Sequence, residues 1–436
     1  MDGGARGKRI AVIGAGIAGL SAAWLLSRAH VVTLFEANDY LGGHTHTVDV
    51  TLDGFTAPVD TGFLVFNDRT YPNLIALFDH LGVASAASEM SFSVRLEKEG
   101  LEWAGSSLTT LFAQRCNLLR PAFWGMLVDI LRFNRKATAL AQGGDAGDAS
   151  LGEFLRGGRY GRAFRDWYLL PMAGAIWSCP TATMLRYPAR TFFRFCDNHG
   201  LLRVSNRPQW RTVIGGARSY VAKLAAGITD VRSSASVVSV LRQPRGVALR
   251  CADGTAGVYD EVVLACHSDQ SLRLLGDADA EERAVLAAVA YQDNEVVLHT
   301  DESFLPRARS AWSAWNYHAG DSREASRPVG VSYLINRLQP LPFRRPVIVT
   351  LNPVRPPRPE SIIDGYSYAH PVFDLGSVEA QLRLPRLQGR RNTWYCGAWT
   401  GYGFHEDGLK SGMAVAAALG AVAPWLPRPE LQKMAA

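Results

Sequence analysis

The feature that most constrains the fold lies near the start of the chain, where a short apolar run leads into a glycine-rich turn. Residues 9–13 have the composition of a buried strand, and they continue into the motif GAGIAG at residues 14–19 and a helix-forming segment at 20–27. A strand, a tight turn and a helix in this order predict a Rossmann-type unit that binds a dinucleotide. The predicted cofactor contacts here are Gly14, Ala15, Gly16, Ile17, Ala18 and Gly19.

Each glycine of this motif has a mechanical role. Gly14 permits the turn, Gly16 lets a pyrophosphate approach the backbone, and Gly19 allows the helix to pack closely on the strand. The anion then lies at a helix N-terminus, where free N–H groups and the helix dipole stabilise it. A second predicted strand, 31–35, ends in Glu36, whose carboxylate suits the hydroxyls of a ribose and disfavours the 2'-phosphate of NADP.

The continuation EANDYLGG at residues 36–43 resembles the FAD-binding amine oxidase and phytoene desaturase superfamily. Its members carry a paired glycine just after the ribose-binding acid. The resemblance implies FAD as the cofactor, with Ala37, Gly42 and Gly43 in contact with it. Relatives usually have arginine after the glycine pair. Here the residue is His44, which we assign to a phosphate contact.

A second predicted cofactor segment lies near the C-terminus. The strand-like run 392–397 ends in Gly397, matching the place where the superfamily has Gly-Asp, but Ala398 replaces the aspartate. The resemblance then implies a helix beginning near Asp407, with its N-terminus aimed at the pyrimidine edge of the isoalloxazine. We therefore expect Asp407, Gly408 and Leu409 at the cofactor. An N-capping role for Asp407 is equally consistent with the sequence.

The remaining segments predict a discontinuous organisation. Strands are expected at 236–243, 247–251 and 261–266, with backbone near Val238 at the adenine. The expected fold is mixed α/β (α+β overall): a Rossmann-type FAD-binding domain of the amine oxidase type with an inserted substrate domain of helices and a β-sheet. The FAD-binding domain is expected at 1–75, 206–289 and 386–436, and the substrate-binding domain at 76–205 and 290–385.

Composition excludes several function classes. The net charge of +6 is modest for 436 residues and does not imply nucleic-acid binding. The six cysteines show neither CxxC nor metal-ligand spacing, so we expect free thiols, no metal site and a cytoplasmic protein. The apolar stretch 10–26 is explained by the glycine motif rather than by a signal sequence or a membrane anchor.

One predicted helix allows a peripheral membrane contact. Residues 121–133 carry apolar side chains at helical spacing, with basic residues around them. Such a helix can lie in a membrane interface at the inner face of the membrane. Alternatively, it packs on the core of its own domain.

A narrower resemblance covers nearly the whole chain. Segments 59–63, 171–178, 198–202, 370–374 and 403–408 are similar to a bacterial group of NAD/FAD-binding oxidoreductases. These are often encoded beside cyclopropane-fatty-acid-synthase-like methyltransferases and include flavin desaturases linked to methylated and furan fatty acids. This resemblance implies a fatty acyl lipid as substrate and a lipid methyltransferase as functional partner.

The absence of lysine between Lys223 and Lys410 argues against an ordinary amine oxidase, which commonly uses a lysine from this region. Desaturation needs a hydride acceptor, a base and a dry apolar tunnel. His405 matches a substrate-facing position in relatives and is the first candidate base, followed by Glu406 and His370. A fatty-acyl double-bond isomerase, an amine oxidase and a non-catalytic partner of the methyltransferase remain as alternatives.

Overall fold

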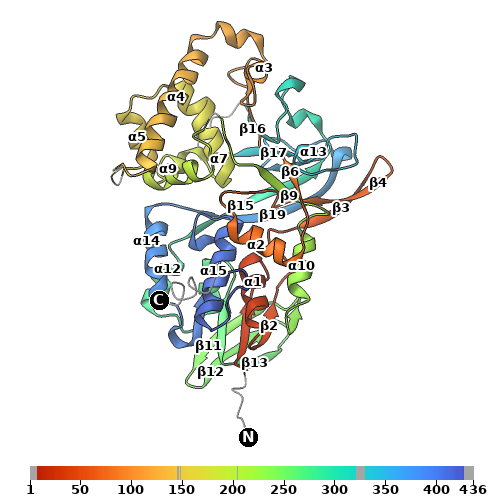
Figure 1. Cartoon of the computed structure of the whole chain (residues 1–436), viewed down its shortest axis with the longest axis vertical. Coiled ribbons are helices and arrows are strands. Elements are labelled where there is room, and N and C mark those ends of the chain that lie inside the picture. The colour runs from red at the N-terminus through yellow and green to blue at the C-terminus, as the bar shows by residue number, and fades with distance from the viewer. Residues whose placement is uncertain (1–6, 145–146, 148, 204, 321–328, 427–436) are drawn as a thin grey trace.

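The computed structural model describes residues 7–144, 147, 149–203, 205–320 and 329–426. Two lobes follow one another along the long axis of the molecule (Figure 1). One lobe contains a parallel sheet and the N-terminal end of the described chain. The other contains a large mixed sheet flanked by helices.

A five-stranded parallel sheet organises the first lobe. Its strands run in the order β10-β2-β1-β14-β20, so segments distant in sequence lie side by side. The central strands are almost fully buried, as expected when both faces of a parallel sheet are covered. The bounds are β10 (Asp230–Arg232), β2 (Val31–Phe35), β1 (Arg9–Ile13), β14 (Glu261–Leu264) and β20 (Thr393–Tyr395).

Helix α1 (Ile17–Leu26) packs against α15 (His405–Ala418), the last helix of the described chain. The contact is close because a side-chain carbon at Gly412 would come within 2.3 Å of the Ala18 carbonyl oxygen. A three-stranded antiparallel sheet extends this lobe. It comprises β11 (Val237–Gln243), β12 (Gly246–Cys251) and β13 (Ala256–Tyr259).

The other lobe is built on a seven-stranded sheet in which only the β16–β7 pair is parallel. In spatial order its strands are β19 (Ile362–Val372), β15 (Ala290–His299), β18 (Ile348–Leu351), β17 (Gly330–Leu334), β16 (Trp315–Ala319), β7 (Phe92–Leu96) and β8 (Leu101–Ala104).

Smaller pieces connect the lobes. A two-stranded ribbon pairs β3 (Thr47–Leu52) with β4 (Phe55–Asp60). A three-stranded sheet joins β5 (Phe66–Asn67), β9 (Trp210–Val213) and β6 (Ser85–Ser88). The helices of this region and of the first lobe are α2 (Pro72–Leu81), α10 (Arg218–Ala225), α11 (Ser268–Leu274), α12 (Ala280–Leu286) and α14 (Leu375–Arg383).

Helices gather on one side of the second lobe and enclose a core of aromatic side chains. The long helix α4 spans residues 121–141. No helix within the described ranges is long and apolar enough to cross a bilayer. The elements of this side are α3 (Leu108–Leu111), η1 (Arg115–Leu119), α4 (Pro121–Ala141), α5 (Leu151–Gly157), α6 (Arg162–Phe164), α7 (Leu170–Trp177), α8 (Thr181–Met184) and α9 (Ala189–Asn198). The short helix α13 (Ile335–Leu338) lies on the other side, next to β17.

The predicted mixed fold with a Rossmann-type unit is confirmed. The strands expected at 236–243 and 247–251 agree with the observed bounds to within one residue, whereas the helix expected over 121–133 continues to Ala141. The domain boundaries stay a prediction. All strands of the parallel sheet nevertheless come from the three segments expected to bind FAD.

Candidate active site

A single cavity of about 1590 Å³ runs from the glycine motif into the second lobe. Near the motif it is lined by backbone and small residues, and farther in by aromatic and aliphatic side chains. Of the cofactor residues predicted from the sequence, the lining includes Gly14, Ala15, Gly16, Ile17, Ala18, Glu36, Ala37, Gly42, Gly43, His44, Gly397 and Ala398.

The turn after β1 has the shape that a pyrophosphate needs. Gly14 has φ +102°, a conformation that other residues rarely adopt. A side-chain carbon at Gly16 would meet no atom within 4 Å, so open space lies above this backbone. At Gly19 the same carbon would come within 1.8 Å of the Gly14 carbonyl oxygen, which fixes Gly19 as a packing position outside the cavity.

Glu36 links the turn to the end of β2. Its carboxylate accepts hydrogen bonds from the backbone N–H of Ala15 at 2.8 Å and of Asn38 at 2.9 Å. Each carboxylate oxygen has a second lone pair, so the side chain can also accept ribose hydroxyls. The open space at Gly16 and this acceptor together fit the adenosine and pyrophosphate of FAD.

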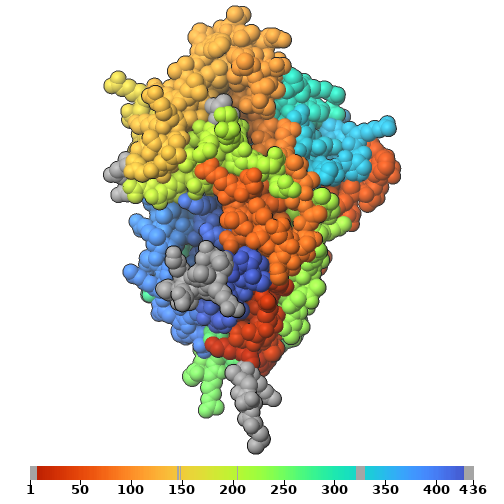
Figure 2. All heavy atoms as spheres, viewed as in Figure 1, coloured from red at the N-terminus to blue at the C-terminus, as the bar shows by residue number. Residues whose placement is uncertain are grey.

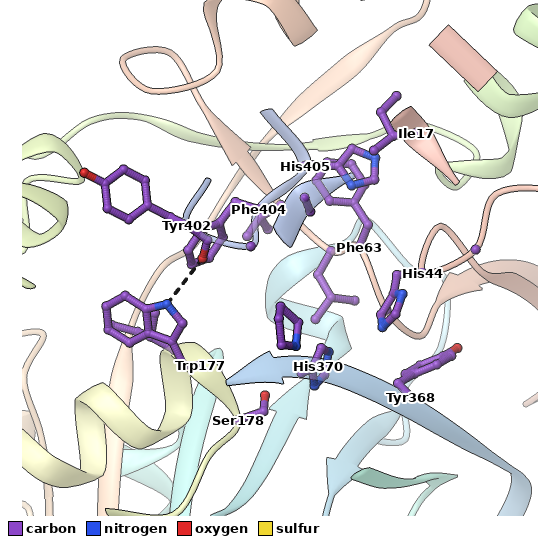
Figure 3. A pocket seen from close by; sticks show the side chains of 18 of the residues that line it. Ile17, His44, Phe63, Trp177, Ser178, Tyr368, His370, Tyr402, Phe404 and His405 are labelled. Atoms are coloured by element: carbon purple, nitrogen blue, oxygen red, sulfur yellow. Dashed lines mark hydrogen bonds between the residues drawn. The ribbon is translucent and has the colours of Figure 1, made fainter. Parts of the chain in front are cut away.

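His44 lines the cavity beside Tyr368 and His370, which β19 of the second lobe contributes (Figure 3). The ring bonds to the backbone of Ala369, while Nε2 is buried with no hydrogen-bond partner among the described atoms. Burial is the main cause of a pKa well below the ordinary value of 6.5, reinforced by neighbouring histidines. The imidazole is therefore neutral at neutral pH, and Nε2 offers a free lone pair.

His370, on β19, lies beside His44 with 5.1 Å between ring centres. The Asn294 amide group donates to His370 Nδ1 at 2.9 Å, and its carbonyl end is fixed because Oδ1 accepts from Gln292 and Asn352. The proton of neutral His370 is thus on Nε2. Burial lowers the pKa of His370 to about 4. Nε2 of His44 can therefore accept a hydrogen bond, whereas the Nε2–H group of His370 can donate one.

His405 begins α15 and also lines the cavity. Its ring stacks on Phe63 with 3.7 Å between centres, and a 2.6 Å hydrogen bond joins Nε2 to the Tyr220 hydroxyl. Thr45 completes this buried cluster through a 2.6 Å bond to Tyr220. Burial lowers the pKa of His405 to about 3. Nε2 already has a partner, so only Nδ1 could take a proton, and the role of His405 as base stays a prediction.

Glu406 is a correction to the sequence prediction. Its carboxylate accepts from the Asn73 backbone and side chain at 3.1 and 2.7 Å, and from the Leu74 N–H at 3.0 Å. These groups belong to the first turn of α2, whose free N–H groups need acceptors. Glu406 is therefore a buried helix cap and does not line the cavity.

The other residues predicted at the second cofactor segment lie just behind the cavity wall. Asp407 accepts from the N–H groups of Tyr402 and Phe404, both at 3.1 Å, so it caps its own helix. Burial raises the pKa of Asp407 to about 6. Gly408 packs near Ile17, and Leu409 is fully buried in the core. At the end of the cavity expected to hold the adenine, the lining includes Ser236 and Val237, next to Val238, whose neighbourhood was predicted from the sequence.

Several residues that line the cavity escaped the sequence prediction. They come from β15, β19, the C-terminal ends of α7 and α9, the loop after β14 and the turn before α15, which approach one another only in the fold. No local motif marks them. They include Trp177, His199, His267, Tyr291, Tyr368 and Phe404.

The cysteines are free, as predicted. No group of histidine, cysteine or acidic side chains within the described ranges could hold a metal ion.

The Rossmann-type turn, the ribose acceptor and the return of the chain at Gly397 define a dinucleotide-binding flavoprotein with a second lobe over the cavity. The chain belongs to the flavin-containing amine oxidoreductase family, which it matches over residues 17–326. It is an FAD-dependent oxidoreductase.

The fold is similar to that of a CLA-producing fatty acid isomerase from P. acnes, with a TM-score of 0.67, 19% identity and 93% of this chain and 97% of that chain covered. It is also similar to cyclohexylamine oxidase from Brevibacterium oxydans IH-35A, with a TM-score of 0.67, 15% identity and 95% and 98% covered. An L-amino-acid oxidase from Pseudechis australis is 51% identical over 49 residues, which are 11% of this chain and 10% of that protein.

Proposed function

We propose that the protein oxidises a carbon–carbon bond of a fatty acyl chain, as a lipid desaturase. The observation that carries the proposal is the character of the cavity beyond His44. It is lined there by side chains such as Met172, Ile176, Trp177, Trp315 and Phe373. An apolar, water-poor channel suits an acyl chain.

The charges along the cavity support the same choice. Among the residues that the structure describes, its lining contains no lysine, and its charged side chains are Glu36, Glu89, Arg207 and Arg273. Glu36 is engaged in the nucleotide end, whereas Glu89 bonds to Arg337 at 2.8 Å. A protonated amine entering this channel would lose its hydration without meeting a free carboxylate in the inner stretch. A neutral chain has no such cost.

Desaturation removes a hydride from one carbon and a proton from its neighbour. Bound FAD supplies the hydride acceptor. In our proposal the proton goes to Nε2 of His44, which is neutral, buried and without a partner. His370 keeps its Nε2 proton and orients polar groups as a hydrogen-bond donor, because Asn294 holds its Nδ1.

Double-bond isomerisation is the second candidate, because the fold is similar to that of a fatty acid isomerase. It uses the same cavity and returns the hydride to another carbon.

Anaerobic mixing with an unsaturated or methyl-branched acyl lipid separates the candidates. Lasting bleaching of the flavin absorbance is expected for a desaturase, and transient bleaching at most for an isomerase. Failure of every acyl lipid to reduce the flavin, together with reduction by an amine, would overturn the proposal. Failure of both would favour a non-catalytic partner of a lipid methyltransferase.

A further inference from the structure

Helix α4 is apolar on two opposite faces. Phe123, Met126 and Phe133 are buried in the second lobe. On the other side Trp124, Val128 and Leu131, at helical positions i, i+4 and i+7, are exposed, Val128 to 63%. Figure 2 shows that the segment around α3 and α4 forms one end of the molecule, opposite the end formed by the first lobe.

The exposed stripe continues onto the turn that precedes α4. Leu119 is 86% exposed, and its neighbour Leu118 is also exposed. The Trp124 indole N–H donates to the Leu118 carbonyl at 3.0 Å, which holds this turn against the helix. Side chains of this size gathered on one surface are typical of a site that another apolar phase covers. We call these five residues, Leu118, Leu119, Trp124, Val128 and Leu131, the α4 patch.

The α4 patch adjoins one end of the cavity. Phe112 packs against Trp124 with 5.5 Å between ring centres, and Leu111 beside it lines the cavity. Leu108, at the start of the same short helix α3, lines the cavity although it is 75% exposed. Leu108 therefore lies at a mouth of the cavity, next to the patch.

The chain segment that carries the patch is rich in positive charge. Between residues 108 and 136 the chain has five basic residues and a single acidic one, Asp129. Asp129 is occupied, because it pairs with Arg132 at 3.3 Å and accepts from the Gly161 N–H at 2.8 Å. The basic residues are Arg115, Arg120, Arg132, Arg135 and Lys136, and because Arg132 and Asp129 neutralise each other, four positive charges remain.

From this combination we propose that the α4 patch docks on an anionic phospholipid bilayer and that acyl chains enter the cavity past Leu108. The apolar side chains would enter the interface, and the arginines would contact lipid phosphates. A second copy of the chain fits less well, because two such basic surfaces repel each other. The entry route rests on the proposed acyl substrate, whereas the docking itself does not.

Co-sedimentation of the FAD-loaded protein with vesicles tests the docking. We expect binding to mixed phosphatidylcholine–phosphatidylglycerol vesicles that weakens with added salt, and weak binding to phosphatidylcholine alone. The double variant Val128→Glu/Leu131→Glu should bind at least about a hundredfold more weakly, since each buried aliphatic side chain contributes roughly tenfold. Val258→Glu/Leu382→Glu, which changes two exposed apolar residues on β13 and α14, should bind as wild type.

Flavin content and melting temperature establish that each variant is folded. Equal vesicle binding by the two double variants would overturn the docking. Equal binding of the wild type to vesicles with and without phosphatidylglycerol would also overturn it. A wild-type dimer that the α4 variant converts to a monomer, without vesicle binding, would instead assign the patch to a second copy.

Flavin reduction tests the entry route separately. We expect the α4 variant to slow reduction by acyl lipid in vesicles but not by the same lipid in detergent. If the wild type and the α4 variant were reduced at the same rate by acyl lipid in vesicles, the proposed entry route past Leu108 would be overturned. Vesicle binding without reduction by any acyl lipid would contradict the proposed function and leave the docking intact.

Discussion

The first nucleotide-binding unit, residues 9–36, and the seven-stranded sheet line one cavity, but their residues come together over very different distances in the sequence. In the first lobe, β1, the glycine turn, α1, β2 and Glu36 follow one another directly. In the second, β7 pairs with β16, so that Ser93 bonds to Asn316, 223 residues away. Because these nucleotide-binding residues are close together in the sequence, a local motif predicts them. The contact between His44 and His370 instead joins residues that lie far apart in the sequence, so it cannot be predicted from a local motif.

The largest expected effect is on the rate of flavin reduction when His44 is substituted. If His44 accepts the proton, His44→Ala should keep FAD and slow flavin reduction by acyl lipid by roughly 10²- to 10⁴-fold. Stopped-flow absorbance of the flavin-loaded variant measures this. His199→Ala is the matched control, since His199 lines the same cavity and burial lowers its pKa to about 4.

Loss of FAD before any change in the reduction rate would make His44 a phosphate contact, as first expected from its position after the glycine pair. The pH dependence adds a check. Because the folded pKa of His44 lies well below 6.5, the neutral form dominates at higher pH. The reduction rate should then be constant above about pH 6.5 and fall only when the pH drops through the folded pKa.

A smaller effect is expected for FAD binding by the glycine turn in the first lobe. Gly16→Val fills the open space above the turn, so FAD affinity should fall by roughly tenfold to a hundredfold while the apoprotein keeps its fold. Flavin content after dialysis and the circular dichroism spectrum report the two properties. Gly125→Val also adds a side chain into open space, on α4, and should retain FAD fully. Equal flavin loss in both variants would refute the assignment of Gly16.

The smallest expected effect concerns His405. Because its Nε2 is bonded to Tyr220 and its ring stacks on Phe63, His405→Ala should lower the melting temperature and the FAD content. The reduction rate of the flavin-loaded fraction should stay within about threefold of wild type, well below the usual contribution of a positioned base. A drop as large as that expected for His44 would return the role of base to His405.

The sequence could predict the glycine turn, Glu36 and the return of the chain at Gly397, because each is marked by neighbouring residues. It could not identify Glu406 as a cap, since the α2 backbone that it stabilises lies 333 residues earlier. Nor could it indicate the tautomer of His370, which depends on β19 lying next to β15 and on Asn294 facing it.

The close packing of α15 on α1 has a consequence for how the protein is made. Ala18 leaves the ribosome long before Gly412, its partner in that contact. Until α15 has been synthesised, α1, which is apolar on all sides, has no α15 to pack against it. Nascent chains therefore expose an aggregation-prone helix during most of their synthesis. Chains that terminate before α15 should be captured by chaperones or degraded rather than accumulate as stable fragments.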